Sequence, residues 1–195
     1  MFTDILEGRL PDGTDLTRRE GDVNRHRPGY DLTFSAPKSV SVLALATGDR
    51  SLAEAHNRAV ERTLDEVEKL ATTRTMQDGV SGMERTGNLV IARFLHDTSR
   101  NLDPQLHTHA VVANVTLAES GWKTLSSDTK NRQGFTDQVW SEQVSLGTLY
   151  RAFLRQDIEA AGYPVTTTGE RGEWDITGMP VKEFSTDAMK ALQAL

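Results

Sequence analysis

The sequence predicts an α+β protein with a central antiparallel sheet and helices packed on it. Two apolar runs with strand character, residues 89–96 and 107–116, are the strongest strand predictions. Two long segments, 52–72 and 137–161, repeat apolar residues at helical spacing. Because strands and helices do not alternate regularly along the chain, an α+β fold is favoured over a parallel βα fold.

Length and composition restrict the class of protein. The chain has 195 residues, 37% of them apolar and 26% charged, which predicts a single soluble domain over residues 1–195. The absence of cysteine excludes disulfides, zinc–thiolate sites and cysteine nucleophiles, and fits a reducing compartment. No apolar run approaches the roughly 18 residues of a membrane span, and the N-terminus lacks a signal-peptide pattern. We therefore expect a cytoplasmic protein without a membrane partner.

The net charge is −6, which argues against a protein that coats nucleic acid through a broad basic surface. A local basic groove remains compatible with it. The basic residues that cluster before the first clear strand are Arg18, Arg19, Arg25, His26 and Arg27.

The first half of the chain predicts a short helix, a strand and two further helices. Residues 30–34 alternate as a strand does, and Ser35 is a plausible N-cap for a helix that Gly48 ends, with a strand as the alternative. Ser51 opens a capping-box pattern for the long helix to about residue 72. His56 lies inside that helix and is expected at its boundary or surface.

The second half predicts mainly strands around one long helix. The runs 89–96 and 107–116 are apolar on both faces, so both are expected to be central strands. Tyr150 and Trp140 belong to the apolar face of the helix 137–161. The remaining predictions are an edge strand near 73–76, a short strand at 122–125, a hairpin around 169–172 and an incomplete helix at 180–195.

Three of the five histidines lie at the ends of the two strongest strands. His107 and His109 are two residues apart, so they point to the same face of a strand, whereas Thr108 points to the other. His96 ends the preceding strand, and antiparallel pairing would bring it across from His107. Three imidazoles on two rigid strands form half of a metal shell and leave positions open for a substrate. The alternative is a set of ordinary polar residues at a strand end.

A metal at this site would polarise a bound phosphoryl oxygen. Imidazole favours Zn, Mn, Co, Ni or Cu by intrinsic affinity, whereas Mg prefers oxygen. A metal-binding histidine usually gives its second N–H to a carboxylate or carbonyl. Candidates are Asp31, Asp97 and Asp103, and we favour Asp31 if its strand lies beside those of the histidines.

Several motifs resemble the TraI/TrwC-type conjugative relaxases, the MobF class of HUH endonucleases. They are D-L-T-F-S-A-P-K-S-V-S (31–41), T-G-N-L-V (86–90) and the histidine segment 96–114. The segments 6–13, 24–30 and 122–128 are similar to the F-plasmid TraI branch in particular. The resemblance covers nearly the whole chain.

The resemblance implies an HUH relaxase fold, with a palm-like antiparallel sheet, that binds single-stranded DNA at a plasmid origin of transfer. Such enzymes nick and rejoin one strand through a tyrosine that becomes linked to the 5′ phosphate. The motif match assigns His96, His107 and His109 as metal ligands and Asp31 as the acidic residue that orients the site. Mg or Mn is the expected metal in use, with Zn, Ni and Co as alternatives. Thr108 stands where the wider superfamily prefers an apolar residue, although this branch commonly has threonine.

The family's nucleophilic tyrosines have no counterpart here. They lie near the native N-terminus, after a first strand, and the chain is expected to start several dozen residues inside the family's domain and to be incomplete at both ends. The three tyrosines present are Tyr30, Tyr150 and Tyr163, and none of them resembles the nucleophile. Whether the chain is itself an enzyme is therefore left open.

The DNA contacts suggested by the resemblance are Gln143 and Arg151. They are eight residues apart on one helix, so they share a face, and both residue types hydrogen-bond to base edges. Solvent-facing helix residues are the equally weighted alternative. Stacking candidates for single-stranded DNA are Trp122, Phe135 and Trp140, with core packing favoured for Trp140.

Two other classes of function stay open: a non-catalytic single-stranded-DNA-binding remnant or regulator, and a small metal enzyme that hydrolyses another substrate. Other relaxosome proteins are possible partners. A missing first strand would leave a central strand unpaired, which predicts self-association or reduced stability.

Overall fold

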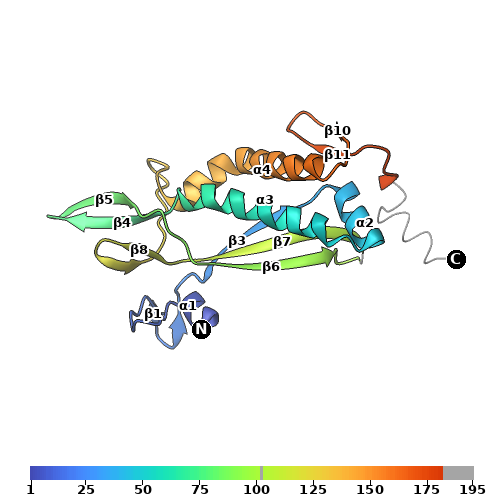
Figure 1. The fold of residues 1–195 in the computed structure, drawn as a ribbon. Helices are drawn as coiled ribbons and strands as arrows, with labels where there is room; N and C mark the ends of the chain where they lie inside the picture. The colour runs from blue at the N-terminus through green and yellow to red at the C-terminus, as the bar shows by residue number, and fades with distance from the viewer. Residues whose placement is uncertain (102, 182–195) are drawn as a thin grey trace. The chain divides into compact units, whose positions relative to one another are not determined.

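The computed structural model describes residues 1–101 and 103–181 (Figure 1). These residues form two compact units, each built from separate stretches of chain. The first unit contains residues 1–32, 65–93 and 110–143, and the second contains residues 33–64, 94–109 and 144–195. The helices are α1 (Phe2–Leu6), α2 (Lys38–Thr47), α3 (Arg50–Glu68) and α4 (Phe135–Ala160).

Eleven strands are described, and most of them form two-stranded hairpins. The strands are β1 (Arg19–Glu20), β2 (Val23–Asn24), β3 (Gly29–Ser35), β4 (Thr72–Gln77), β5 (Val80–Arg85), β6 (Ile91–Thr98), β7 (Pro104–Ala113), β8 (Thr116–Ala118), β9 (Gly121–Lys123), β10 (Val165–Thr167) and β11 (Trp174–Ile176). Together with the four helices they confirm the predicted α+β class.

The largest described sheet has the strand order β3–β7–β6. Backbone hydrogen bonds at the two ends of β3, from Asn114 N to Pro28 O and from Ala36 N to Leu106 O, indicate antiparallel pairing with β7. β7 is central, as expected, but among the described strands β6 lies at an edge, so its predicted central place is wrong. The apolar residues Phe94 and Leu95 of β6 are 49% and 45% exposed. Apolar composition therefore did not mean burial on both sides.

Helices α2 and α3 form where they are predicted, but with different capping residues. Ser35 is the last residue of β3 rather than the N-cap of α2. Asp175 of β11 supplies the cap instead, because its Oδ1 accepts the Ser39 N–H at 3.2 Å and the Ser39 hydroxyl at 2.6 Å. At the start of α3, Asp49 Oδ1 accepts the Ser51 N–H at 2.9 Å, so Asp49 takes the place predicted for Ser51.

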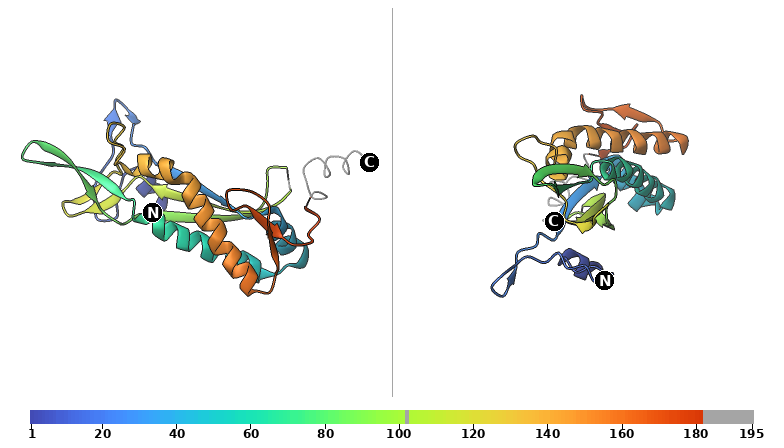
Figure 2. Two further views of the ribbon diagram at one scale, coloured as in Figure 1. Left: turned by 90° about the horizontal axis from the view of Figure 1, so that it is seen from above. Right: turned by 90° about the vertical axis from the view of Figure 1, so that its left-hand side faces the viewer.

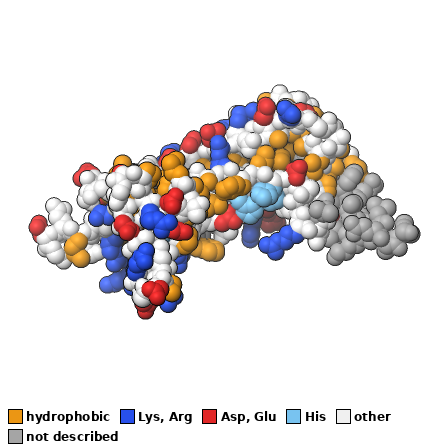
Figure 3. Space-filling model, turned by 90° about the horizontal axis from the view of Figure 1, so that it is seen from below, with side chains coloured by type: hydrophobic (Ala, Val, Ile, Leu, Met, Phe, Trp, Pro, Cys, Tyr) orange, Lys and Arg blue, Asp and Glu red, His pale blue; other side chains and the backbone are white. Residues whose placement is uncertain are grey.

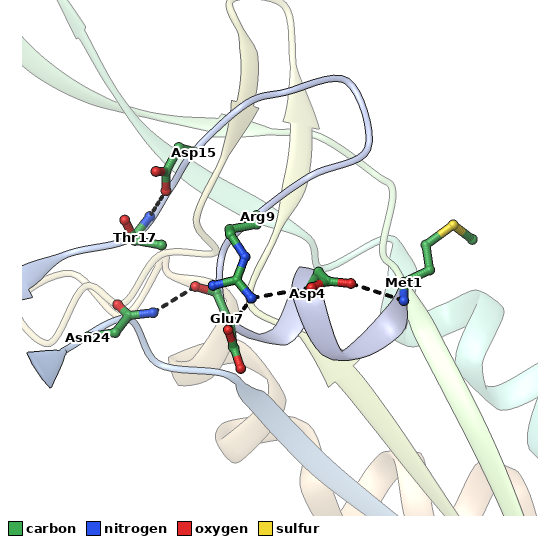
Figure 4. Close-up of polar contacts among 7 residues, drawn as sticks. All are labelled: Met1, Asp4, Glu7, Arg9, Asp15, Thr17 and Asn24. Atoms are coloured by element: carbon green, nitrogen blue, oxygen red, sulfur yellow. Dashed lines mark hydrogen bonds and ion pairs between the residues drawn. The ribbon is translucent and has the colours of Figure 1, made fainter.

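The N-terminal segment belongs to the first unit and is held by polar contacts (Figure 4). Arg9 forms ion pairs with Asp4 and Glu7. Asn24 donates its side-chain N–H to the Glu7 carbonyl at 2.8 Å. Beneath these contacts lies a small apolar cluster whose buried members are Ile5, Leu10, Ala113 and Val115, with Trp122 packed against it.

Two hairpins differ in what they pack against. In the first unit, β4 and β5 form a hairpin (Figure 2). They pair over six residues each, and the turn places Asp78 and Gly79 at positive φ, as a type I′ turn requires. In the second unit, the hairpin of β10 and β11 packs against α4, because Trp174 Nε1 donates to the Arg151 carbonyl at 3.0 Å. The helix predicted over 180–195 lies almost wholly outside the described residues.

Two side chains on the long helices have the opposite exposure to the one predicted. His56 on α3 is fully buried, whereas Trp140 on α4 is 73% exposed. Helical spacing shows which residues share a face, but not how far along the helix that face is covered. Within the described ranges, no helix has the length and apolarity needed to cross a membrane.

Candidate metal centre and nucleic-acid site

The three predicted histidines gather in the second unit. The ring centroids of His96 and His107 are 5.1 Å apart, those of His96 and His109 are 5.4 Å apart, and those of His107 and His109 are 5.2 Å apart. His96 is exposed, and His107 and His109 are half-buried. A patch of histidine side chains is accordingly visible on the surface in Figure 3.

These distances suit three imidazoles around one ion. A metal–nitrogen bond of about 2.1 Å puts a ring centroid roughly 3.3 Å from the metal, so ligands at 90–109° would have centroids about 4.7–5.4 Å apart. The donor nitrogens do not point at one common position. Among the described residues, no group of three or more His, Cys, Asp or Glu side chains has the geometry to hold an ion. The ring positions therefore fit a metal, and side-chain rotations would be needed to close the shell.

One ring nitrogen of each strand β7 histidine already has a partner. His107 Nδ1 donates to the carbonyl of Gln105 at 2.9 Å, which leaves Nε2 with its lone pair for a metal. His109 Nδ1 lies 3.3 Å from the Thr33 hydroxyl of β3. The carbonyl of Gln105 is one of the two kinds of partner that a metal-binding histidine usually takes. Gln105 lies on the same strand as His107, whereas the Thr33 partner depends on the register of β3 against β7.

Asp31 is exposed on β3, two residues before Thr33, and strand alternation gives both side chains the same face of that strand. Asp31 belongs to the first unit and the histidines to the second. Its predicted role as the acidic residue of the site therefore stays a prediction.

Behind the triad, three buried polar side chains were not recognised in the sequence as a group. His56 Nε2 lies 2.8 Å from the Thr108 hydroxyl, and His56 Nδ1 lies 2.7 Å from the Tyr150 hydroxyl. Burial, together with the nearby charge of His107, lowers the pKa of His56 to about 4. The imidazole is therefore neutral at physiological pH.

Each of the three tyrosines packs against, or hydrogen-bonds to, a neighbouring side chain. Tyr30 is half-buried and contacts Phe135 edge-to-face, with centroids 5.8 Å apart. Tyr150 is buried against Phe34 and His56. The Tyr163 hydroxyl donates to Asp49 Oδ2 at 3.2 Å. Burial raises the pKa of Tyr30 and Tyr150, and the hydrogen bond to Asp49 raises the pKa of Tyr163, so none of the three hydroxyls is made more acidic by its surroundings.

The predicted DNA contacts differ in how available they are. Gln143 is exposed on α4. Arg151 is half-buried, and its Nη2 donates to the Arg171 carbonyl at 2.7 Å, so it also holds the loop of the β10–β11 hairpin. Of the stacking candidates, Phe135 is only 1% exposed and Trp140 is the most accessible. Both DNA contacts stay predictions.

The fold and the gathered rings define a class: an α+β protein whose antiparallel sheet carries a histidine triad. The model of the TrwC relaxase family matches residues 1–193, and the chain therefore belongs to that family. The multifunctional conjugation protein TraI of Escherichia coli strain K12 is 56% identical over 185 residues, which cover 95% of this chain and 10% of that protein. A second TraI from Escherichia coli is 52% identical over 195 residues, or 100% of this chain and 11% of that protein.

Solved structures of the conjugative relaxase TrwC are also similar. A metal-free complex with OriT DNA has a TM-score of 0.83 and 38% identity, covering 99% of this chain and 66% of that chain. A complex with a 27-mer DNA comprising the recognition hairpin and the cleavage site has a TM-score of 0.84 and 37% identity, covering 99% and 67%. A metal-bound complex with OriT DNA has a TM-score of 0.83 and 36% identity, covering 99% and 65%. This chain spans about a tenth of the length of the TraI proteins it matches.

Proposed function

We propose that this chain is the metal- and DNA-binding part of a relaxase that acts on one strand of a plasmid origin of transfer. The observation that carries the proposal is the cluster of His96, His107 and His109, with ring centroids 5.1–5.4 Å apart. Support for the DNA substrate comes from the solved TrwC complexes with OriT DNA. Support for a divalent metal comes from the metal-bound TrwC complexes.

In this proposal the three imidazoles hold a divalent cation, with Mg or Mn in use and Zn, Ni or Co as alternatives. When bound, the metal would polarise a non-bridging oxygen of the scissile phosphate. The carbonyl of Gln105 fixes the tautomer of His107, so that Nε2 remains a ligand. Asp31 orients the site and helps to accept the proton of the attacking hydroxyl. Gln143 and Arg151 contact the bases of the single strand.

The attacking tyrosine is proposed to be absent from this chain. All three of its tyrosines have a raised pKa, and the hydroxyls of Tyr150 and Tyr163 are hydrogen-bonded to His56 and Asp49. On this basis the chain binds the substrate and the metal but does not cleave alone. The second candidate, a non-catalytic binder or regulator of origin DNA, is favoured by the same observation.

Metal binding is tested by titrating the chain with Mn²⁺ and Ni²⁺ in a calorimeter. One site is expected, and His107→Ala or His109→Ala should weaken it by at least about tenfold, because each removes a ligand. Thr98→Ala on β6 is the matched control, since it truncates an exposed side chain close to His96 without removing a ligand. Equal affinity of all four proteins would rule out the triad as the metal site.

The reaction is tested with a single-stranded oligonucleotide from an origin of transfer. Binding is followed by fluorescence anisotropy, and covalent adducts are followed by denaturing electrophoresis. We expect binding without an adduct. An adduct that disappears with Tyr30→Phe would contradict the missing nucleophile. Sequence-specific binding that survives His107→Ala in chelator would instead favour the regulator.

Further relaxosome proteins as partners, and a cytoplasmic location, are proposed from the resemblance and the family. The TraI relatives are named multifunctional conjugation proteins, which supports a role in conjugation. Co-purification of other relaxosome proteins from a plasmid-bearing cell would test the partners, and fractionation of that cell would test the location.

A further inference from the structure

The side chain between the two histidines of β7 begins a chain of buried hydrogen bonds. Thr108 is 1% exposed, His56 is 0% exposed and Tyr150 is 3% exposed. The bond lengths are 2.8 Å between Thr108 Oγ1 and His56 Nε2, and 2.7 Å between His56 Nδ1 and Tyr150 OH. All three residues belong to the second unit, which also contains the histidine triad. These two hydrogen bonds thus join β7 to α3 and α4.

The position of Thr108 on β7 couples these hydrogen bonds to the histidine triad. Side chains alternate along a strand, so Thr108 points away from the face on which His107 and His109 lie. Its backbone is continuous with both, so a shift or rotation of β7 at Thr108 moves both imidazoles. An apolar side chain could fill the same space, but its dispersion contacts would add little directional preference to the backbone pairing of β7 with β3 and β6.

The hydrogen bonds of Thr108, His56 and Tyr150 are directional, so they favour one position of β7. A neutral imidazole has one donor and one acceptor nitrogen, so His56 can satisfy both neighbours only when Thr108 and Tyr150 take complementary roles. Tyr150 is itself fixed by packing, with its ring centroid 5.5 Å from that of Phe34 and 5.7 Å from that of His56. Each buried polar group would lose its partner if β7 shifted, which makes one strand position strongly preferred.

We propose that Thr108, His56 and Tyr150 form a positioning relay that holds the H-x-H segment of β7 in the register needed for metal binding. The relay acts through the backbone and touches neither metal nor substrate. This inference rests on the proposed function, because it assigns the relay a purpose at the proposed metal centre. Thr108 and His56 are positioning residues, and Tyr150 anchors them to α4.

The experiment compares the metal affinity of Thr108→Val, Thr108→Ser and the unchanged chain by Mn²⁺ and Ni²⁺ calorimetry. Valine keeps the shape and removes the hydroxyl, so we expect about tenfold weaker binding, in the range of losses caused by outer-shell changes at metal sites. Serine keeps the hydroxyl and should restore affinity to within about twofold. The Co²⁺ absorption spectrum should change with valine and not with serine.

Thr63→Val is the matched control. Thr63 is also a fully buried threonine of the second unit, but its hydroxyl donates to the Ala59 carbonyl of its own helix at 2.8 Å. The control should lose stability without a change in metal affinity or spectrum. If circular dichroism shows that Thr108→Val is not folded, the metal affinity of Tyr150→Phe is measured instead. We expect that affinity to be about threefold weaker.

The possible outcomes separate the two proposals. If Thr108→Val binds the metal as tightly as the unchanged chain, the relay is overturned and the metal centre is left intact. The same holds for Tyr150→Phe where Thr108→Val is not folded. No metal binding by the unchanged chain, or binding indifferent to His107→Ala, would overturn the metal centre itself.

Discussion

At the scale of single residues, the buried imidazole of His56 has the largest consequence for stability. It is 0% exposed and bonded to two neutral hydroxyls, so a proton on it would place a charge in a site without a counterion among its hydrogen-bond partners. Burial and the charge of His107 lower its pKa from 6.5 to about 4. The folded state therefore resists a protonation that the unfolded state accepts.

This predicts a pH-dependent stability with a definite sign. Above pH 6.5 His56 is neutral in both states, and its contribution is fully present. Between pH 6.5 and about 4 the unfolded state binds the extra proton, so the free energy of unfolding falls, by on the order of 2 kcal/mol between pH 7 and pH 5. The measurement is urea unfolding in chelator at both pH values.

His56→Gln is the comparison that isolates this effect. Glutamine retains hydrogen-bonding groups and does not titrate, so the variant should lose most of the fall between pH 7 and pH 5. His26 is also buried with a lowered pKa and contributes in the same direction, which is why a difference between two proteins is required. An equal fall in both proteins would show that His56 is not the titrating group.

At the scale of elements, the backbones of β3 and β7 approach closely at Gly29. A Cβ added at Gly29 would lie 2.2 Å from the Val112 carbonyl oxygen and 3.2 Å from the Ala113 Cα. These are backbone atoms of the central strand and cannot move aside as a flexible side chain would. The pairing that aligns β3 with the histidine strand therefore depends on the absence of a side chain at this position.

Gly29→Ala is accordingly expected to lower the free energy of unfolding by about 2 kcal/mol or more, because overpacking forces the strands apart. Chemical denaturation measures the change. Gly82→Ala on β5 is the control, since its added Cβ would meet only the Thr75 hydroxyl at 3.5 Å, an ordinary contact. A variant at Gly29 as stable as the one at Gly82 would contradict the tight approach.

Local sequence pattern was sufficient for the triad and insufficient for its surroundings. Two-residue spacing put His107 and His109 on one face, and the hairpin-like order of the strands brought His96 to them. The partners Thr33, His56 and Tyr150 lie on other elements, far away in sequence, so no local pattern could identify them. Their selection depends on the register of β3 against β7 and on which helix faces are covered.

The same limit explains the errors in the elements. The alternation and turn residues correctly predicted β3 and the β10–β11 hairpin, and helical spacing predicted α4, whereas only an edge strand near 73–76 was predicted where β4 and β5 form a hairpin. The edge position of β6 and the exposure of Trp140 depend on what packs beside them. Asp175 caps α2 from more than a hundred residues away, and sequence proximity favoured Ser35 instead.

At the scale of the whole molecule, the two compact units share their main elements. Strands β3, β6 and β7 each contribute residues to both units, so no single point in the sequence divides them. The prediction of one domain over residues 1–195 is compatible with this continuity and stays a prediction. Within this arrangement, β6 is the feature that bears most directly on association between copies of the chain.

Self-association through β6 is the last prediction. Among the described strands β6 pairs on one side, with β7, and it exposes Phe94 and Leu95 at 49% and 45%. An apolar edge strand is a template for pairing with another chain, so we expect a dimer that grows with protein concentration. Sedimentation velocity over a hundredfold concentration range measures it.

Leu95→Lys should shift the equilibrium toward monomer, since a lysine on an edge strand opposes pairing. Leu117→Lys is the control, because Leu117 is 47% exposed on β8, in the other unit, and should leave association unchanged. A monomer at every concentration, or equal effects of the two lysines, would exclude β6 as the interface.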